Sequence, residues 1–139
     1  MTRINASIRP AELSNSMLFA EYREICRIPN TIKSGRAVVK DIPKTFKLQS
    51  QHVKFFYDKI LYLSKRSDAL YQECLRRGIN AQDYSDCYKN IPPHLFNDWK
   101  ETKESRQLLK ERINLRLTES KQVHRYYDKV VSLEEILIK

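Results

Sequence analysis

The stretch that decides the fold is residues 10–29, PAELSNSMLFAEYREICRIP. Proline is favoured at the first position of a helix and disfavoured beyond the first turn, so Pro10 and Pro29 predict a helix over residues 10–28. At 100° per residue, this helix carries a stripe of side chains on one face. The stripe consists of Leu13, Met17, Ala20, Glu24 and Ile28.

Glu24 lies on this apolar stripe and is expected to point inward, where a carboxylate is costly unless it is paired. Arg23 and Arg27 lie on one shoulder of the stripe, close enough to offset that cost or to share a bound phosphate with the carboxylate. Two interpretations stay open. Glu24 either forms a buried ion pair with Arg27 or Arg3 that only orients the helix, or acts as a general acid or base.

Two further helices are predicted downstream. The aromatic stretch at residues 52–59 leads into the first, which ends at Gly78 and whose expected inner face is Ile60, Leu63, Leu70, Cys74 and Leu75. The second is expected over residues 103–121, with an apolar stripe of Leu108, Leu109, Ile113 and Leu117. Residues 37–51 read as a polar, basic loop.

Composition agrees with a small helical protein. The chain has 139 residues, of which 41% are hydrophobic, and only two are glycine. We therefore expect a mainly α fold, with one compact domain over residues 1–139 and three principal helices. The formal net charge of +9 favours a polyanionic partner, although charge alone fits DNA, RNA or an acidic membrane equally well.

Other classes of site have little support in the sequence. Cys26, Cys74 and Cys87 are odd in number and lack metal-type spacing, and no apolar segment precedes them that would direct the chain to an oxidising compartment. We expect reduced thiols in a cytoplasmic protein, no bound metal, no cofactor and no membrane span, since no apolar run approaches about 18 residues.

The N-terminus offers a nucleophile. A small residue after Met1 lets the initiator be removed, which leaves Thr2 with a free α-amine. An α-amine has a pKa of about 7.7–8.0, against roughly 10.4 for lysine, so part of it is neutral at cellular pH and can attack an electrophilic carbon. The alternative is a terminus without a function, which is the usual case.

Several motifs together carry a resemblance to a known family. The segment Met1-Thr2-Arg3-Ile4-Asn5, followed by Ala20-Glu21-Tyr22-Arg23-Glu24 and Arg27, resembles the phage pyrimidine-dimer DNA glycosylase/AP lyase family, the endonuclease V of T-even phages. The similarity continues through residues 52–53, 55–59, 73–75 and 77–78 and reaches residues 126–127 and Lys129, but is weak between residues 84 and 106.

The resemblance implies a fold in which the N-terminal segment threads between helices and brings the Thr2 amine to Glu24. It implies that the amine attacks C1′ of the damaged nucleotide, displaces the base and forms an imine, after which β-elimination breaks the strand. Glu24 would then stabilise the cationic transition state and move the proton. The implied substrate is double-stranded DNA with damage or abasic sites, kinked and with a nucleotide flipped out, bound by a monomer.

The resemblance also implies a set of DNA contacts. Phosphate binding is expected from Arg3, Arg23 and Arg27, and from Arg112 and Arg116 on the third helix. A C-terminal group of Arg125, Tyr126 and Tyr127 corresponds to the aromatic cluster of the family. Three positions depart from the family pattern, with Ser16, Met17 and Val123 in place of glutamine, histidine and tryptophan.

Those departures leave three hypotheses open. The first is a glycosylase/AP lyase acting on pyrimidine dimers, and the second is the same chemistry on another damaged or modified base. The third is a non-catalytic DNA-binding protein that keeps the fold.

Overall fold

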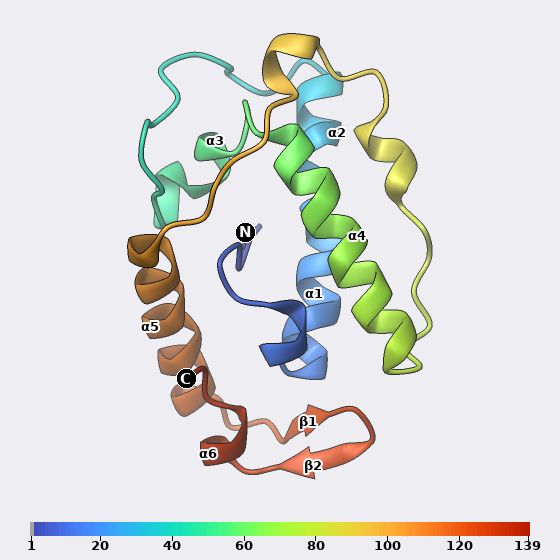
Figure 1. The fold of residues 1–139 in the computed structure, drawn as a ribbon, viewed down its shortest axis with the longest axis vertical. Coiled ribbons are helices and arrows are strands. Elements are labelled where there is room, and N and C mark those ends of the chain that lie inside the picture. Colours follow the sequence, from blue (N-terminus) through green and yellow to red (C-terminus); the bar gives the residue numbers. More distant parts are fainter. Residues whose placement is uncertain (1) are drawn as a thin grey trace.

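The computed structural model describes residues 2–139, and Met1 lies outside them. Three long helices dominate the fold, α1 (Asn15–Ile25), α4 (Ile60–Arg76) and α5 (Lys103–Glu119), as Figure 1 shows. Shorter helical segments are η1 (Pro10–Glu12), α2 (Arg27–Lys33), η2 (Gln49–Gln51), α3 (His52–Phe55), η3 (Ser85–Tyr88), η4 (Pro93–Leu95) and α6 (Leu133–Ile136). The prediction of a mainly α protein with three principal helices is confirmed.

The first predicted helix is wrong at both ends. Pro10 begins the short η1, and α1 starts only at Asn15, because the Ser14 hydroxyl caps it by accepting a hydrogen bond from the Met17 amide. Pro29 does not end the helical region but is the third residue of α2. Amides in the first turn of a helix have no intrahelical acceptor, so a proline there costs no hydrogen bond.

The end of α4 follows its sequence signal. Gly78 has a φ of +72°, the left-handed conformation that glycine adopts without a steric cost. Its amide donates to the Leu75 carbonyl, and the Ile79 amide donates to that of Cys74, which together form a Schellman motif. Leu75 itself is 48% exposed, so its predicted place on the inner face is wrong.

α5 starts at Lys103 as predicted and ends at Glu119, two residues before the predicted end. Leu109, Ile113 and Leu117 are buried, whereas Leu108 is substantially exposed and does not belong to the inner face. A two-stranded antiparallel hairpin follows, β1 (His124–Tyr126) and β2 (Lys129–Val131), with Arg125 opposite Val130. This hairpin was not predicted, because strands of three residues are too short to reveal a period.

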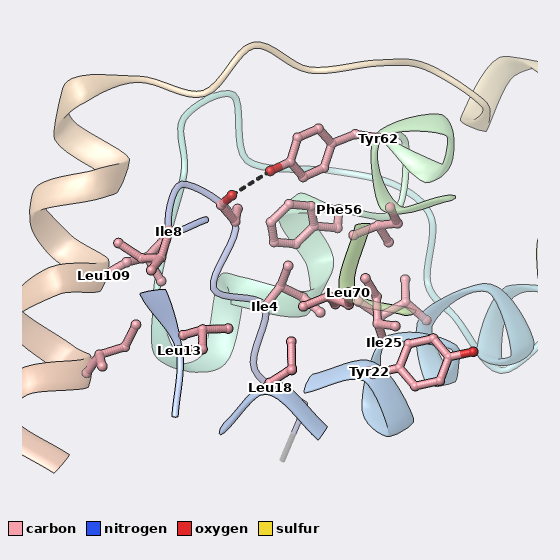
Figure 2. Close-up of a cluster of buried hydrophobic side chains, with 14 of the residues drawn as sticks. Ile4, Ile8, Leu13, Leu18, Tyr22, Ile25, Phe56, Tyr62, Leu70 and Leu109 are labelled. Atoms are coloured by element: carbon pink, nitrogen blue, oxygen red, sulfur yellow. Dashed lines mark hydrogen bonds between the residues drawn. The ribbon is translucent and has the colours of Figure 1, made fainter. Parts of the chain in front are cut away.

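The N-terminal segment runs between the long helices, as Figure 1 shows, which confirms the expected threading. Ile4, Ala6 and Ile8 are buried along it and enter the hydrophobic core. Figure 2 shows Ile4 among core side chains of α1 and α4, and Ile8 beside Leu109 of α5. We call residues 4–8 the N-terminal thread.

Candidate active site

A buried ion pair between α1 and α4 holds the middle of the thread. Glu21 accepts two hydrogen bonds from Arg66, at 2.9 Å from Nε and 3.0 Å from Nη2. The remaining guanidinium nitrogen, Nη1, donates to the thread at the carbonyls of Ala6 (3.2 Å) and Ile8 (2.6 Å). Both charged side chains are almost fully buried, so this pair links two helices to the thread in a medium of low dielectric.

Histidine holds the start of the thread. The Ile4 amide donates to His52 Nε2 at 2.9 Å, and the other ring nitrogen, Nδ1, lies 2.8 Å from the Lys47 carbonyl. Burial lowers the pKa of His52 to about 4, with a smaller contribution from the positive charge of Arg112. The imidazole is therefore neutral at neutral pH.

α5 holds the thread from the other side. Arg112 Nη2 donates to the side-chain oxygen of Asn5 at 3.0 Å, and Arg106 Nη1 donates to the Ser7 carbonyl at 3.1 Å. The Ser7 and Ser105 hydroxyls lie 2.5 Å apart. Backbone and side chains of the thread are thus bonded to α3, α4 and α5, which fixes the path of the chain just after Thr2 and Arg3.

A small cavity of about 70 Å³ opens between the thread, α1 and α5. Glu24 lines it together with Glu21, Met17 and Ala20 from α1, and α5 contributes Arg112, Ile113 and Arg116. Arg3 and Asn5 of the N-terminal segment complete the wall. The predicted stripe therefore faces the cavity over Met17, Ala20 and Glu24, with Met17 also packed against the core, and its end residues Leu13 and Ile28 are buried.

The helical projection places Glu24 toward the interior, but its side chain is not buried in the core. Its side chain is 22% exposed, and its carboxylate lies 3.8 Å from Arg27 Nη1. Arg27 is 57% exposed, so the pair is open to solvent and contributes little to stability. The fully buried carboxylate of α1 is Glu21, three residues earlier on the same side of the helix.

Three arginines give the cavity its positive charge. Burial and, to a smaller extent, the neighbouring Arg3 lower the pKa of Arg112 to about 10. The pKa of Arg116 is also lowered, by burial and then by Arg3. Among residues 2–139, none of these three arginines forms an ion pair. An anion at this cavity would relieve their mutual repulsion.

The predicted site residues fall into two groups. Arg3, Glu24, Arg112 and Arg116 share the cavity, and Arg27 adjoins it through Glu24. Thr2 is half-buried and directly precedes Arg3, so its Cα lies about 3.8 Å from that of a cavity residue. Arg23 is exposed on α1 and lies over the ring of Phe19, at 5.0 Å from its centroid.

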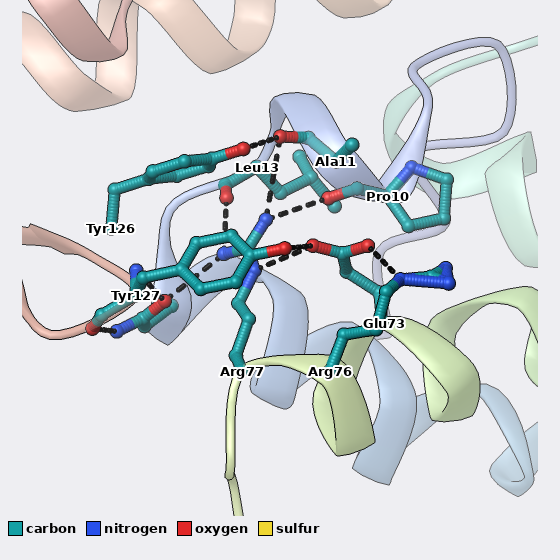
Figure 3. A network of polar contacts seen from close by, with 9 residues as sticks. Pro10, Ala11, Leu13, Glu73, Arg76, Arg77, Tyr126 and Tyr127 are labelled. Carbon is teal, nitrogen blue, oxygen red and sulfur yellow. Dashed lines mark hydrogen bonds and ion pairs between the residues drawn. The ribbon is translucent and has the colours of Figure 1, made fainter.

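Arg125, Tyr126 and Tyr127 are part of the hairpin and do not line the cavity. Arg125 is exposed, and the two tyrosines contact the residues around the start of α1 and the end of α4. Figure 3 shows Arg77 between the two tyrosines, with its guanidinium carbon 4.4 Å and 5.0 Å from the ring centroids of Tyr126 and Tyr127. The Tyr126 hydroxyl donates to the Ala11 carbonyl at 2.8 Å.

The same cluster binds the second tyrosine hydroxyl. The Tyr127 hydroxyl donates to Glu73 Oε2 at 3.1 Å, and Arg77 Nε donates to the same carboxylate oxygen at 2.8 Å. Arg77 further donates to the carbonyls of Leu13 (2.7 Å) and Pro10 (3.2 Å). Both tyrosine hydroxyls are therefore used inside the protein, and only their rings are available to a partner.

His52, Glu21 and Arg66 were missed in the sequence. Arg66 had a usable signal, because it lies three residues after Leu63 and four before Leu70, within the apolar stripe of α4. A charged residue at such a position is expected to have a buried partner. His52 had no such signal, since its bond to Ile4 joins residues 48 apart in the chain.

Other kinds of site find no support in residues 2–139. Within that range no group of three or more His, Cys, Asp or Glu side chains is placed to hold a metal ion. No described helix is both long and apolar enough to cross a membrane. Cys26, Cys74 and Cys87 are all free thiols.

The chain matches the family model described as pyrimidine dimer DNA glycosylase over residues 1–86. The matched part contains Thr2, the thread, Glu24 and the Glu21–Arg66 pair, while Arg112, Arg116 and the hairpin lie beyond it. Since the match covers 86 of 139 residues, the chain belongs to the pyrimidine dimer DNA glycosylase family.

Proposed function

We propose that the protein is a DNA N-glycosylase with associated AP lyase activity on UV-induced cyclobutane pyrimidine dimers, acting on double-stranded DNA as a monomer. Membership of a DNA glycosylase family implies damaged DNA as the substrate. The observation that carries the proposal is the position of Glu24. Its side chain lines a cavity walled by Arg3, Arg112 and Arg116, and Arg3 directly follows Thr2 in the chain.

The proposed nucleophile is the α-amine of Thr2, freed by removal of Met1. In its neutral form the amine attacks C1′ of the damaged nucleotide, and the bond from C1′ to the base breaks. The base leaves with the bonding electrons and takes up a proton. Opening of the sugar ring then gives a cationic imine that joins the amine nitrogen to C1′.

The imine makes the protons at C2′ acidic. Removal of one of them breaks the bond between C3′ and its phosphate oxygen, and the strand is cut by β-elimination. Glu24 is the proposed base for this proton, and its negative charge also stabilises the cationic imine. Water finally hydrolyses the imine and releases the amine.

The arginines are proposed to hold the DNA backbone. Arg3, Arg112 and Arg116 line the cavity and form no ion pair within residues 2–139, although Arg112 also donates to Asn5, and Arg23 and Arg27 extend the cationic surface along α1 and α2. Because such contacts carry no sequence information, the lesion must be selected by the deformability of damaged DNA and by the shape of the pocket.

A second candidate is the same chemistry on another damaged or modified base. It is favoured by Met17, which lines the cavity where the family has a histidine, and by Val123, which is 65% exposed where a tryptophan is expected. Arg125, Tyr126 and Tyr127 are proposed as DNA contacts through the arginine charge and the tyrosine rings. Incision of duplexes that carry a cyclobutane dimer, an abasic site or other damaged bases separates the two candidates.

The decisive test is chemical trapping of the imine. Protein whose mass establishes that Met1 is absent is incubated with abasic duplex DNA and borohydride, which should yield a covalent protein–DNA adduct. Protein with extra residues before Thr2 is the matched control and should give no adduct, since its Thr2 nitrogen is an amide. A clean failure of the first protein to trap would reject both enzyme candidates and leave a non-catalytic DNA-binding protein.

A further inference from the structure

His52 connects the N-terminal thread to the loop that precedes α3. The side chain is 2% exposed and packs edge-to-face against Phe46 and Phe56. The centroids of these two rings lie 5.5 Å and 5.4 Å from that of the imidazole. Its two ring nitrogens make the bonds to the Ile4 amide and the Lys47 carbonyl. The imidazole is thus held by packing on its faces and by hydrogen bonds at both polar atoms.

The two bonds define one protonation state. Because the Ile4 amide is a donor, Nε2 must accept and carries no proton, and Nδ1 therefore carries the proton and donates to Lys47. Burial and the positive charges of Arg112 and Arg3 both disfavour the imidazolium. This arrangement keeps an acceptor aimed at the backbone of Ile4.

We propose that His52 is a positioning residue for the Thr2 amine, because its bond to the Ile4 amide fixes the backbone two residues from the nucleophile. The inference rests on the proposed function of Thr2. Residues 2 and 3 lie in no helix or strand, and the bond of His52 to Ile4 is the first hydrogen bond along residues 2–139, so the proposed approach of the amine to Glu24 depends on this anchor. A displacement of about 1 Å at a reacting group can cost roughly a hundredfold in rate.

Two amide substitutions of His52 distinguish a positioning role from a general need for a polar side chain. In His52→Gln the amide oxygen lies as many bonds from Cβ as Nε2 does and can accept from Ile4. In His52→Asn the amide reaches only as far as Nδ1, so it can bond to Lys47 but not to Ile4. Leu95→Ala, a core truncation in η4, controls for lost stability.

The experiment measures single-turnover borohydride trapping on abasic duplex DNA, DNA affinity, and hydrogen exchange of the Ile4 amide. We expect His52→Asn to trap about tenfold more slowly or worse, with its DNA affinity within about twofold of wild type and a rapidly exchanging Ile4 amide. His52→Gln should restore both the rate and the protection of Ile4. Leu95→Ala should trap at the wild-type rate well below its melting temperature.

Equal trapping rates for His52→Asn and wild type would overturn the inference, as would a loss of rate that His52→Gln does not restore. Failure of wild-type protein with a free Thr2 amine is a different result, because it rejects the proposed function before any variant is compared. Protection of the Ile4 amide then still reports whether His52 is its acceptor.

Discussion

Glu24 combines partial exposure with a cationic neighbourhood. Its side chain is 22% exposed, and Arg3, Arg112 and Arg116 line the same cavity. Glu21 provides the contrast within the same helix, since both of its oxygens are occupied by Arg66. Glu21 is therefore fully paired within the protein, whereas Glu24 faces the cavity and, among residues 2–139, is paired only with the exposed Arg27.

Replacement of Glu24 by glutamine should abolish strand cleavage and leave DNA binding within about threefold. The amide keeps the size of the side chain but can neither accept the C2′ proton nor offset the positive imine, a loss of roughly a hundredfold or more. Cleavage and binding are measured on the same abasic duplex. Glu104→Gln, at an exposed position of α5, is the control. Unchanged turnover in Glu24→Gln would remove Glu24 from its proposed role.

His52 also makes stability depend on pH. The pKa of His52 is about 4 in the folded protein, against the ordinary histidine value of 6.5 that applies in the unfolded chain. The unfolded chain therefore binds the proton more readily. Stability is therefore complete above about pH 6.5 and is lost as the pH falls towards 4, by up to about 3 kcal/mol. Urea unfolding at pH 7, 5.5 and 4.5 tests this, and His52→Gln should lose less stability over the same range. An identical loss in both proteins would contradict the assignment.

Among the elements, α4 links the two ends of the chain. Arg66, in the middle of α4, bonds to α1 and to the thread. Arg77, which directly follows the last residue of α4, lies between the tyrosines of the hairpin. Figure 3 shows how Arg77 also reaches the segment around η1, through the carbonyls of Pro10 and Leu13. The N-terminal thread and the C-terminal hairpin are consequently both held by α4 and the residue that follows it.

Two adjacent residues of α4 allow a matched comparison. Arg66→Met should cost about 3–5 kcal/mol, because it leaves the Glu21 carboxylate and the Ile8 carbonyl buried without their donor, while the Ala6 carbonyl keeps the Tyr62 hydroxyl. Lys65→Met removes an ion pair with Asp98 that is largely exposed and should cost less than about 1 kcal/mol. Chemical denaturation gives both values. A similar small loss in both variants would show that Arg66 does not hold the thread.

The elements that could be predicted are those with a local cause. Gly78 marks the end of α4 because glycine adopts the left-handed conformation found there without a steric cost. The apolar repeat of Leu109, Ile113 and Leu117 identifies the inner face of α5. Pro29 led to a wrong prediction of the helix end, because a proline breaks a helix only beyond its first turn and Pro29 lies in the first turn of α2. The hairpin was missed because its strands are short and its stability comes from Arg77, a residue of another element.

At the scale of the whole molecule, the site is assembled from distant parts of the sequence. Arg3 and Arg116 lie at opposite ends of the chain and line one cavity with Glu24. Periodicity placed Glu24 and a resemblance suggested the arginines, but only the packed fold defines which carboxylate is buried and which faces the cavity. Long-range bonds such as that of His52 to Ile4 have no local signature and cannot be inferred from spacing.

The distribution of charge predicts how binding responds to salt. The protein has a net charge of +9, and Arg3, Arg112 and Arg116 line one cavity. Its affinity for duplex DNA should therefore fall steeply with salt, and the plot of log binding constant against log salt concentration should have a slope of about −0.9 for each phosphate contact. Arg116→Ala should reduce this slope by about one and weaken binding to damaged and undamaged duplexes alike. Lys89→Ala removes an equal charge next to η3, where Lys89 is paired with Asp86, and should leave the slope unchanged. Fluorescence anisotropy between about 50 and 200 mM salt gives the slopes. Equal slopes for Arg116→Ala and wild type would place the bound DNA away from this cavity.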